Sequence, residues 1–164
     1  MQIQRMTRDA LLTGIALIIF TIEAALPALS PVPGIKLGLS NIITVYAMFA
    51  IGPRDALAIL CSRILLSTFV TGNVSALMYS AAGGALCCLA MLFLRRILNP
   101  EQIWVASVIG AACHNLGQIL VAVAVTRTVG LFAYLPVLMV SGMIAGLFTG
   151  LCGQMMASRL KKSP

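Results

Sequence analysis

Residues 103–125 read IWVASVIGAACHNLGQILVAVAV, an apolar stretch that contains no Asp, Glu, Lys or Arg. A helix needs about 20 mostly apolar residues to cross a lipid bilayer. This stretch reaches that length and predicts a membrane-spanning helix. Its unusual feature is the polar group formed by His114, Asn115 and Gln118, which lies inside the predicted span rather than at its ends.

The rest of the chain has the same apolar character. Its 164 residues are 60% apolar and 9% charged, with 11 Lys and Arg, 4 Asp and Glu, and a net charge of +7. Soluble domains carry roughly 25% charged residues, so this composition excludes a soluble globular domain. The chain has no G-x-x-x-x-G-K-[ST] phosphate loop, and its spans leave little room for a separate nucleotide-binding domain. Any process that consumes energy would therefore need a partner protein to supply that energy.

Five further apolar runs complete a predicted all-α bundle of six transmembrane helices in a single integral membrane domain. The predicted spans are residues 10–29, 37–51, 56–70, 77–94, 103–125 and 135–156. An even number of spans places both termini on one side of the membrane.

The basic residues indicate which side that is. Lys and Arg accumulate in cytoplasmic loops. With the N-terminus cytoplasmic, Lys36 and Arg127 fall outside, and eight basic residues fall inside: Arg5, Arg8, Arg54, Arg95, Arg96, Arg159, Lys161 and Lys162. We therefore expect both termini in the cytoplasm of a multi-pass cell-membrane protein. The basic residues form no stripe with interleaved aromatics, so nucleic acid is not an expected partner.

Ionisable groups within spans are costly and usually face a bundle interior or a watery cavity. Glu23, Lys36, Arg63 and His114 are such groups in the predicted layout. Glu23 and Lys36 would lie near the outer face, while Arg63 and His114 lie closer to mid-depth. Together they predict a polar pocket that opens outward. An alternative for Glu23 is that it only neutralises Lys36 or Arg63, because buried charges usually pair.

The polar group in residues 103–125 adds amides to this pocket. His114 and Gln118 are four residues apart and Asn115 and Gln118 three apart, so the three share one helical face. Such a face can read the donors and acceptors of a ligand. The alternative is that these side chains only form hydrogen bonds with neighbouring helices.

Two breaks between spans supply further candidates. Irregular backbone at membrane depth persists only where it is buried in protein or lines a cavity. The first break surrounds Lys36 and leads to Asn41, and the second, residues 71–75, contains Asn73 and Ser75. Lys36 has a simpler interpretation as a lysine that snorkels to the interface.

Small residues four apart let helices approach closely. The last span has Gly142, Gly146 and Gly150 at this spacing, and the first has Ala10 and Gly14. We interpret the former mainly as packing within the chain and the latter as a candidate surface for a partner subunit. The cysteines Cys61, Cys87, Cys88, Cys113 and Cys152 fall in apolar runs without a C-x-x-C pair, so neither a disulfide frame nor a metal site is expected.

Three segments resemble one family. Residues 33–42 (PGIKLGLSNI), 79–84 (YSAAGG) and 114–118 (HNLGQ) are similar to the Gx transporter family, also labelled heptaprenyl diphosphate synthase component I. That family is similar to the S components of energy-coupling factor transporters. The resemblance implies a six-helix bundle that binds a vitamin-like molecule or cofactor precursor from outside. It also implies a membrane coupling subunit and two cytoplasmic ATPases as partners, with Ala10 and Gly14 on the docking helix.

The expected binding residues, with Tyr79 added from the second segment, are Glu23, Lys36, Asn41, Arg63, Asn73, Tyr79, His114, Asn115 and Gln118. An enzymatic role is not expected, because prenyl transfer needs clustered Asp residues for magnesium and the chain has only Asp9 and Asp55, expected at two separate cytoplasmic edges. The alternative hypotheses are a non-catalytic membrane subunit linked to isoprenoid, quinone or flavin redox metabolism, and an independent secondary carrier.

Overall fold

The computed structural model describes residues 2–25, 38–72 and 74–160. Throughout these residues the fold is helical, and no strand occurs among them. The long helices are α1 (Gln2–Ala25), α3 (Pro53–Thr71), α4 (Val74–Leu94), α5 (Ile103–Thr126) and α6 (Leu135–Leu160). A shorter apolar element combines α2 (Asn41–Tyr46) with a π-helical turn, η1 (Ala47–Ile51). Two short 3₁₀ turns, η2 (Pro100–Gln102) and η3 (Val129–Tyr134), precede α5 and α6.

Local sequence explains several helix ends. Pro53 opens α3, where its missing N–H costs nothing because the first amides of a helix have no partner inside it. Gly72 closes α3 with a left-handed φ of 64°, which glycine adopts without strain. The π-helical turn ends where the Gly52 N–H donates to the carbonyl of Ala47, five residues back.

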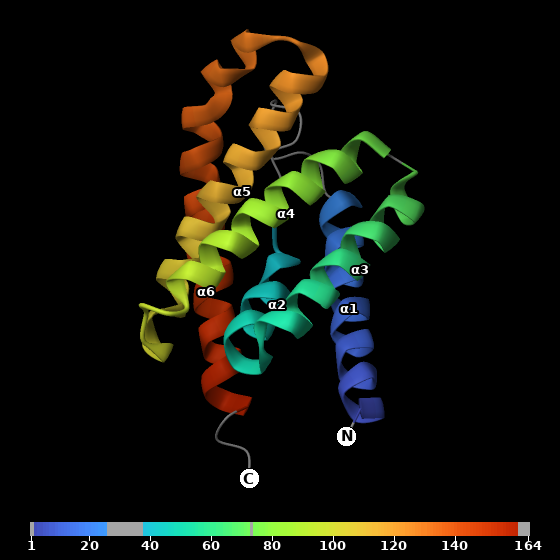
Figure 1. The fold of residues 1–164 in the computed structure, drawn as a ribbon, viewed down its shortest axis with the longest axis vertical. Coiled ribbons are helices and arrows are strands. Elements are labelled where there is room, and N and C mark those ends of the chain that lie inside the picture. Colours follow the sequence, from blue (N-terminus) through green and yellow to red (C-terminus); the bar gives the residue numbers. More distant parts are fainter. Residues whose placement is uncertain (1, 26–37, 73, 161–164) are drawn as a thin grey trace.

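Two groups of helices surround the centre of the molecule (Figure 1). Helices α5 and α6 run side by side as a long antiparallel hairpin, and α4 crosses against α5. On the other side α1 packs along α3, and α2 lies between these groups in contact with α6. In Figure 1, α1 begins and α6 ends at the same end of the molecule.

The glycines of α6 pack within the chain. A β-carbon on Gly146 would lie 2.8 Å from the Ala111 β-carbon, and one on Gly150 would lie 2.7 Å from the Trp104 α-carbon. These distances are too short for real contacts, so α5 and α6 approach as closely as they do because these positions carry no side chain.

The core and the surface of the bundle are both apolar. Buried residues from α1 to α5, among them Val45, Met48, Ile59 and Met91, form one cluster. Large apolar side chains also cover the outside, for example Ile18, Phe69 and Ile144. Three segments are long and apolar enough to cross a membrane: Leu77–Leu94, Ile103–Thr126 and Val129–Arg159. A helix that is apolar all round is typical of a membrane span, so the fold is that of a helical membrane protein.

A candidate ligand-binding cavity between the helices

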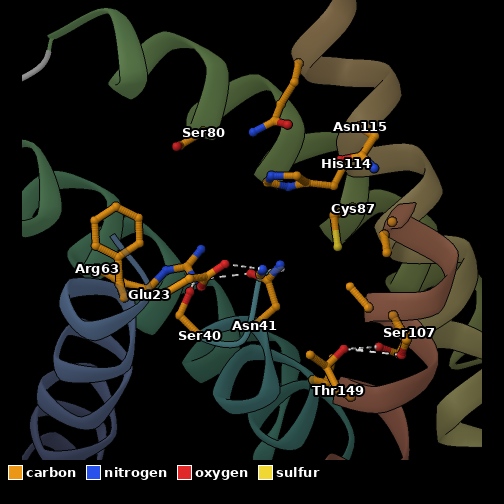
Figure 2. Close-up of a pocket in the computed structure, with 18 of the residues that line it drawn as sticks. Glu23, Ser40, Asn41, Arg63, Ser80, Cys87, Ser107, His114, Asn115 and Thr149 are labelled. Atoms are coloured by element: carbon orange, nitrogen blue, oxygen red, sulfur yellow. Dashed lines mark hydrogen bonds between the residues drawn. The ribbon is translucent and has the colours of Figure 1, made fainter. Parts of the chain in front are cut away.

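A cavity of about 140 Å³ lies between the helices, and each of the six helices contributes to its lining. One water needs roughly 10–15 Å³ by this measure, so the space suits a small organic molecule. The wall contains seven of the residues expected from sequence: Glu23, Asn41, Arg63, Tyr79, His114, Asn115 and Gln118. Figure 2 shows how the labelled residues among them surround the centre. Lys36 and Asn73, which were also expected here, lie outside the described residues.

Arg63 is the central charged group of one wall. Its side chain extends from α3 and is only 6% exposed. Nη1 donates to Ser40 Oγ and, over 3.1 Å, to Asn41 Oδ1 (Figure 2). Both acceptors belong to the start of α2, so α2 fixes the guanidinium in place with neutral partners.

Glu23 accepts hydrogen bonds from the backbone, whereas the sequence suggested charge pairing with Lys36 or Arg63 as one option. Lys36 lies outside the described residues, so only the second half of that option can be compared with the structure. Its two carboxylate oxygens accept the backbone N–H groups of Gly38 and Leu39, the second over 3.1 Å. Glu23 is adjacent to Arg63 in Figure 2, but the two form no ion pair in the described part of the chain. The carboxylate therefore ties α1 to the turn that leads into α2.

His114 and Asn115 of α5 lie across the cavity from Arg63 (Figure 2). His114 packs on the backbone of α4: a β-carbon on Gly83 would be 2.9 Å from His114 Nδ1. Asn115 Nδ2 donates to the Leu138 carbonyl of α6. Asn115 thus makes the interhelical bond that the alternative interpretation anticipated, and it also lines the cavity. Gln118 lines the cavity one turn further along α5 and forms no hydrogen bond with the residues that the structure describes.

Sequence reasoning missed the small hydroxyl residues of the lining. These are Ser40, Ser67, Thr68, Ser80, Ser107 and Thr149. Ser107 and Thr149 form a buried hydrogen bond of 3.1 Å between α5 and α6. Ser40 and Ser80 had a usable signal, since Ser40 directly precedes Asn41 and Ser80 directly follows Tyr79. The others had none, because Ser and Thr in apolar helices commonly bond to the carbonyl one turn back, as Thr68 does to Ile64.

The remaining carboxylates lie away from the cavity. Asp55, in the first turn of α3, accepts hydrogen bonds from Arg5 Nε (2.6 Å) and Arg8 Nη2 (3.0 Å), and Arg8 also pairs with Asp9. Burial alone would raise the pKa of Asp55, but the hydrogen bond from Arg5 and the charges of Arg5 and Arg8 outweigh it and lower the pKa below its ordinary value. These pairs join α1 to α3 at the end where α1 begins.

The residues that the structure describes form neither a metal site nor a disulfide. No group of three or more His, Cys, Asp or Glu side chains that could hold a metal ion occurs in residues 2–25, 38–72 and 74–160. All five cysteines, which fall within these ranges, are free.

The small residues of α1 differ from those of α6. A β-carbon on Gly14 would meet nothing within 4 Å, and Ala10 is exposed. This strip of α1 is therefore not used for packing within the described chain.

Fold and cavity together define a helical membrane protein with a polar cavity enclosed by apolar helices. The chain belongs to the heptaprenyl diphosphate synthase component I family, whose sequence description matches residues 12–156. This agrees with the resemblance noted from the three segments. No curated protein and no solved structure gives a significant match.

Proposed function

We propose that this protein is the membrane-embedded substrate-binding subunit of an importer of the energy-coupling factor type. It takes a small vitamin-like molecule or cofactor precursor from the outside into the cavity between its helices. The observation that carries the proposal is Arg63, a buried cation that lines a cavity and has only neutral hydrogen-bonding partners among the described residues. Burying such a charge is costly, and membrane proteins keep such groups mainly for ligands and pathways.

The polar wall opposite Arg63 supports binding rather than only packing. Tyr79, Ser80 and Gln118 line the cavity and form no hydrogen bond with described residues. Buried polar groups are normally satisfied, so groups that face a cavity are available to a ligand. A few such groups in an otherwise apolar pocket are the usual composition of a small-molecule site.

The proposed arrangement in the membrane is six spans with both termini in the cytoplasm. Support comes from the distribution of basic residues and from α1 beginning at the end where α6 finishes (Figure 1). Single cysteines placed at residues 54 and 127 of a cysteine-free variant test it. A membrane-impermeant maleimide added to intact cells should label residue 127 and not residue 54, and the reverse pattern would exclude this orientation.

The proposed partners are a membrane coupling subunit and two cytoplasmic ATPases. The strip of α1 around Ala10 and Gly14, open in the described chain, is the proposed docking surface. Gly14→Leu should abolish co-purification of the coupling subunit and leave the melting temperature of the isolated protein unchanged. Gly130→Leu, in η3, is the matched control because the space around Gly130 is also open.

The decisive experiment for the function combines capture with transport. The tagged protein is purified from native membranes, the captured proteins are identified, and any small molecule that co-purifies is extracted and identified by mass spectrometry. Co-purification of ATPases with a coupling protein, together with ATP-dependent uptake of the extracted molecule into proteoliposomes, supports the proposal. Uptake by the isolated chain, driven by an ion gradient, would instead indicate a secondary carrier.

The family name favours a second candidate, a non-catalytic membrane subunit linked to isoprenoid or quinone metabolism. In that case the same capture should recover a prenyl diphosphate synthase subunit, or flavin or quinone proteins, and no ATPase. Its loss should then reduce prenyl or quinone synthesis even when the imported nutrient is supplied in excess.

A further inference from the structure

One edge of the Arg63 guanidinium has no hydrogen-bonding partner among the described residues. Ser40 and Asn41 both accept from Nη1, whereas Nε and Nη2 form no bond with any described residue. Arg63 is one of the residues that line the cavity, so this edge lies at the cavity wall. The N–H groups of Nε and Nη2 point in parallel, and this spacing matches the two oxygens of a carboxylate.

No acidic side chain among the described residues forms an ion pair with this edge. All four acidic residues of the sequence fall within the described ranges. Asp9 and Asp55 are paired with Arg5 and Arg8 at the end where α1 begins. Glu101 is exposed in η2. Both oxygens of Glu23 are engaged by the backbone at Gly38 and Leu39.

The charge of the lining limits the ligand to few negative charges. Among the described lining residues Arg63 is the one Lys or Arg, and the adjacent Glu23 carboxylate repels anions. A diphosphate normally brings magnesium, which prefers carboxylate oxygens as protein ligands, and no acidic cluster occurs in the described chain to receive it. One guanidinium fork therefore suits one carboxylate far better than a diphosphate.

We propose that the cavity binds a small molecule with a single carboxylate, held by the Nε and Nη2 edge of Arg63. The body of the molecule reaches toward Tyr79, Ser80 and Gln118, which supply hydrogen bonds to its polar groups. This inference rests on the proposed binding function and adds the substrate class. It separates the protein from prenyl diphosphate chemistry, despite the family name.

The test uses matched probes on the purified full chain in detergent, with melting temperature as the readout. The probes are nicotinate with nicotinamide, 4-hydroxybenzoate with 4-hydroxybenzamide, inorganic phosphate and inorganic diphosphate. Each is added at millimolar concentration to the parent, Arg63→Lys, Arg63→Gln and the control Arg54→Gln, whose residue is exposed at the start of the same helix. Arg63→Lys keeps the charge and removes the fork.

The expected result is that at least one carboxylate raises the melting temperature of the parent and of Arg54→Gln, and that its amide and both phosphates do not. Its apparent affinity should fall about tenfold or more in Arg63→Lys and be lost in Arg63→Gln. The comparison of acid with amide in the parent remains valid if Arg63→Gln does not fold.

Two results would overturn the carboxylate assignment while leaving a binding function intact. The first is that diphosphate stabilises the parent but not Arg63→Gln, or that an amide does so as strongly as its acid. The other is a carboxylate that stabilises Arg63→Gln as well as the parent, which would mean that Arg63 is not its partner. If no probe stabilises the parent and capture recovers no ATPase, both the substrate class and the proposed function are wrong.

Discussion

Asn115 of α5 occupies the space that a side chain at Gly142 of α6 would need. A β-carbon on Gly142 would fall well inside van der Waals contact of Asn115 Nδ2, the atom that donates to the Leu138 carbonyl. The missing side chain at 142 therefore lets one amide reach the backbone of α6 and remain on the wall of the cavity.

We expect Gly142→Ala to destabilise the protein. Although alanine favours helix by about 1 kcal/mol over glycine, overpacking typically costs about 1–3 kcal/mol, and here it would also displace Asn115 from its hydrogen bond. The melting temperature should fall relative to Gly130→Ala, the matched control in open space. In an Asn115→Ala background the loss should disappear. A loss that persists there would place the clash elsewhere.

Glu23→Gln should loosen the turn that carries Ser40 and Asn41. The carboxylate accepts two backbone N–H groups with two oxygens, whereas a glutamine has only one acceptor oxygen. Leaving a buried N–H without a partner costs about 1–3 kcal/mol, so both the melting temperature and ligand affinity should fall. Thr21→Val is the control, because Thr21 is exposed and its hydroxyl bonds only to Leu17 of its own helix. Equal effects of the two changes would argue against an anchoring role for Glu23.

The pair formed by Asp55 with Arg5 predicts acid sensitivity. The folded-state pKa of Asp55 lies below its ordinary value of 3.8, so the pair stabilises the fold fully above pH 3.8. That contribution is lost as pH falls from 3.8 through the folded-state pKa. Asp55→Asn should lower the melting temperature at neutral pH and flatten its decline below pH 3.8, and high salt should reduce the difference because both arginines are partly exposed. Glu101→Gln, which removes an exposed carboxylate, is the control substitution. If Asp55→Asn has the same acid profile as the parent protein, the assignment is contradicted.

Ser40 and Asn41 are expected to act on the ligand through Arg63. Removing both acceptors with Ser40→Ala and Asn41→Ala leaves the charge in the cavity without the bonds that orient it. Ligand affinity should fall by about tenfold, since hydrogen bonds to charged groups contribute about 1.5–3 kcal/mol. In a double-mutant cycle with Arg63→Lys, which keeps a measurable affinity, the combined loss should be smaller than the sum of the two separate losses. Additive losses would mean that Ser40 and Asn41 contact the ligand independently.

Much of the helix layout was predictable, because apolar periodicity and length are local properties. The run 103–125 corresponds to α5, and Gly52-Pro53 and Gly72 delimit α3 through their own backbone preferences. Helix α1 begins at Gln2, ahead of the predicted membrane span of residues 10–29. Its charged first turns stay helical because Arg5 and Arg8 are paired with Asp55 on α3, a contact between residues far apart in sequence that no local pattern encodes.

The sequence alone determined that the chain is helical and apolar enough for a membrane. It also singled out Arg63 and the polar face at residues 114–118 as groups that are costly inside a membrane. Those conclusions follow from composition and from the cost of polar groups in lipid. Only the tertiary structure decided what each polar group does. It showed that Glu23 binds backbone N–H groups rather than Arg63, and that Asn115 reaches α6 over Gly142. It also left one edge of the Arg63 guanidinium without a hydrogen-bonding partner among the described residues, because such partners depend on how helices cross and not on their order in the chain.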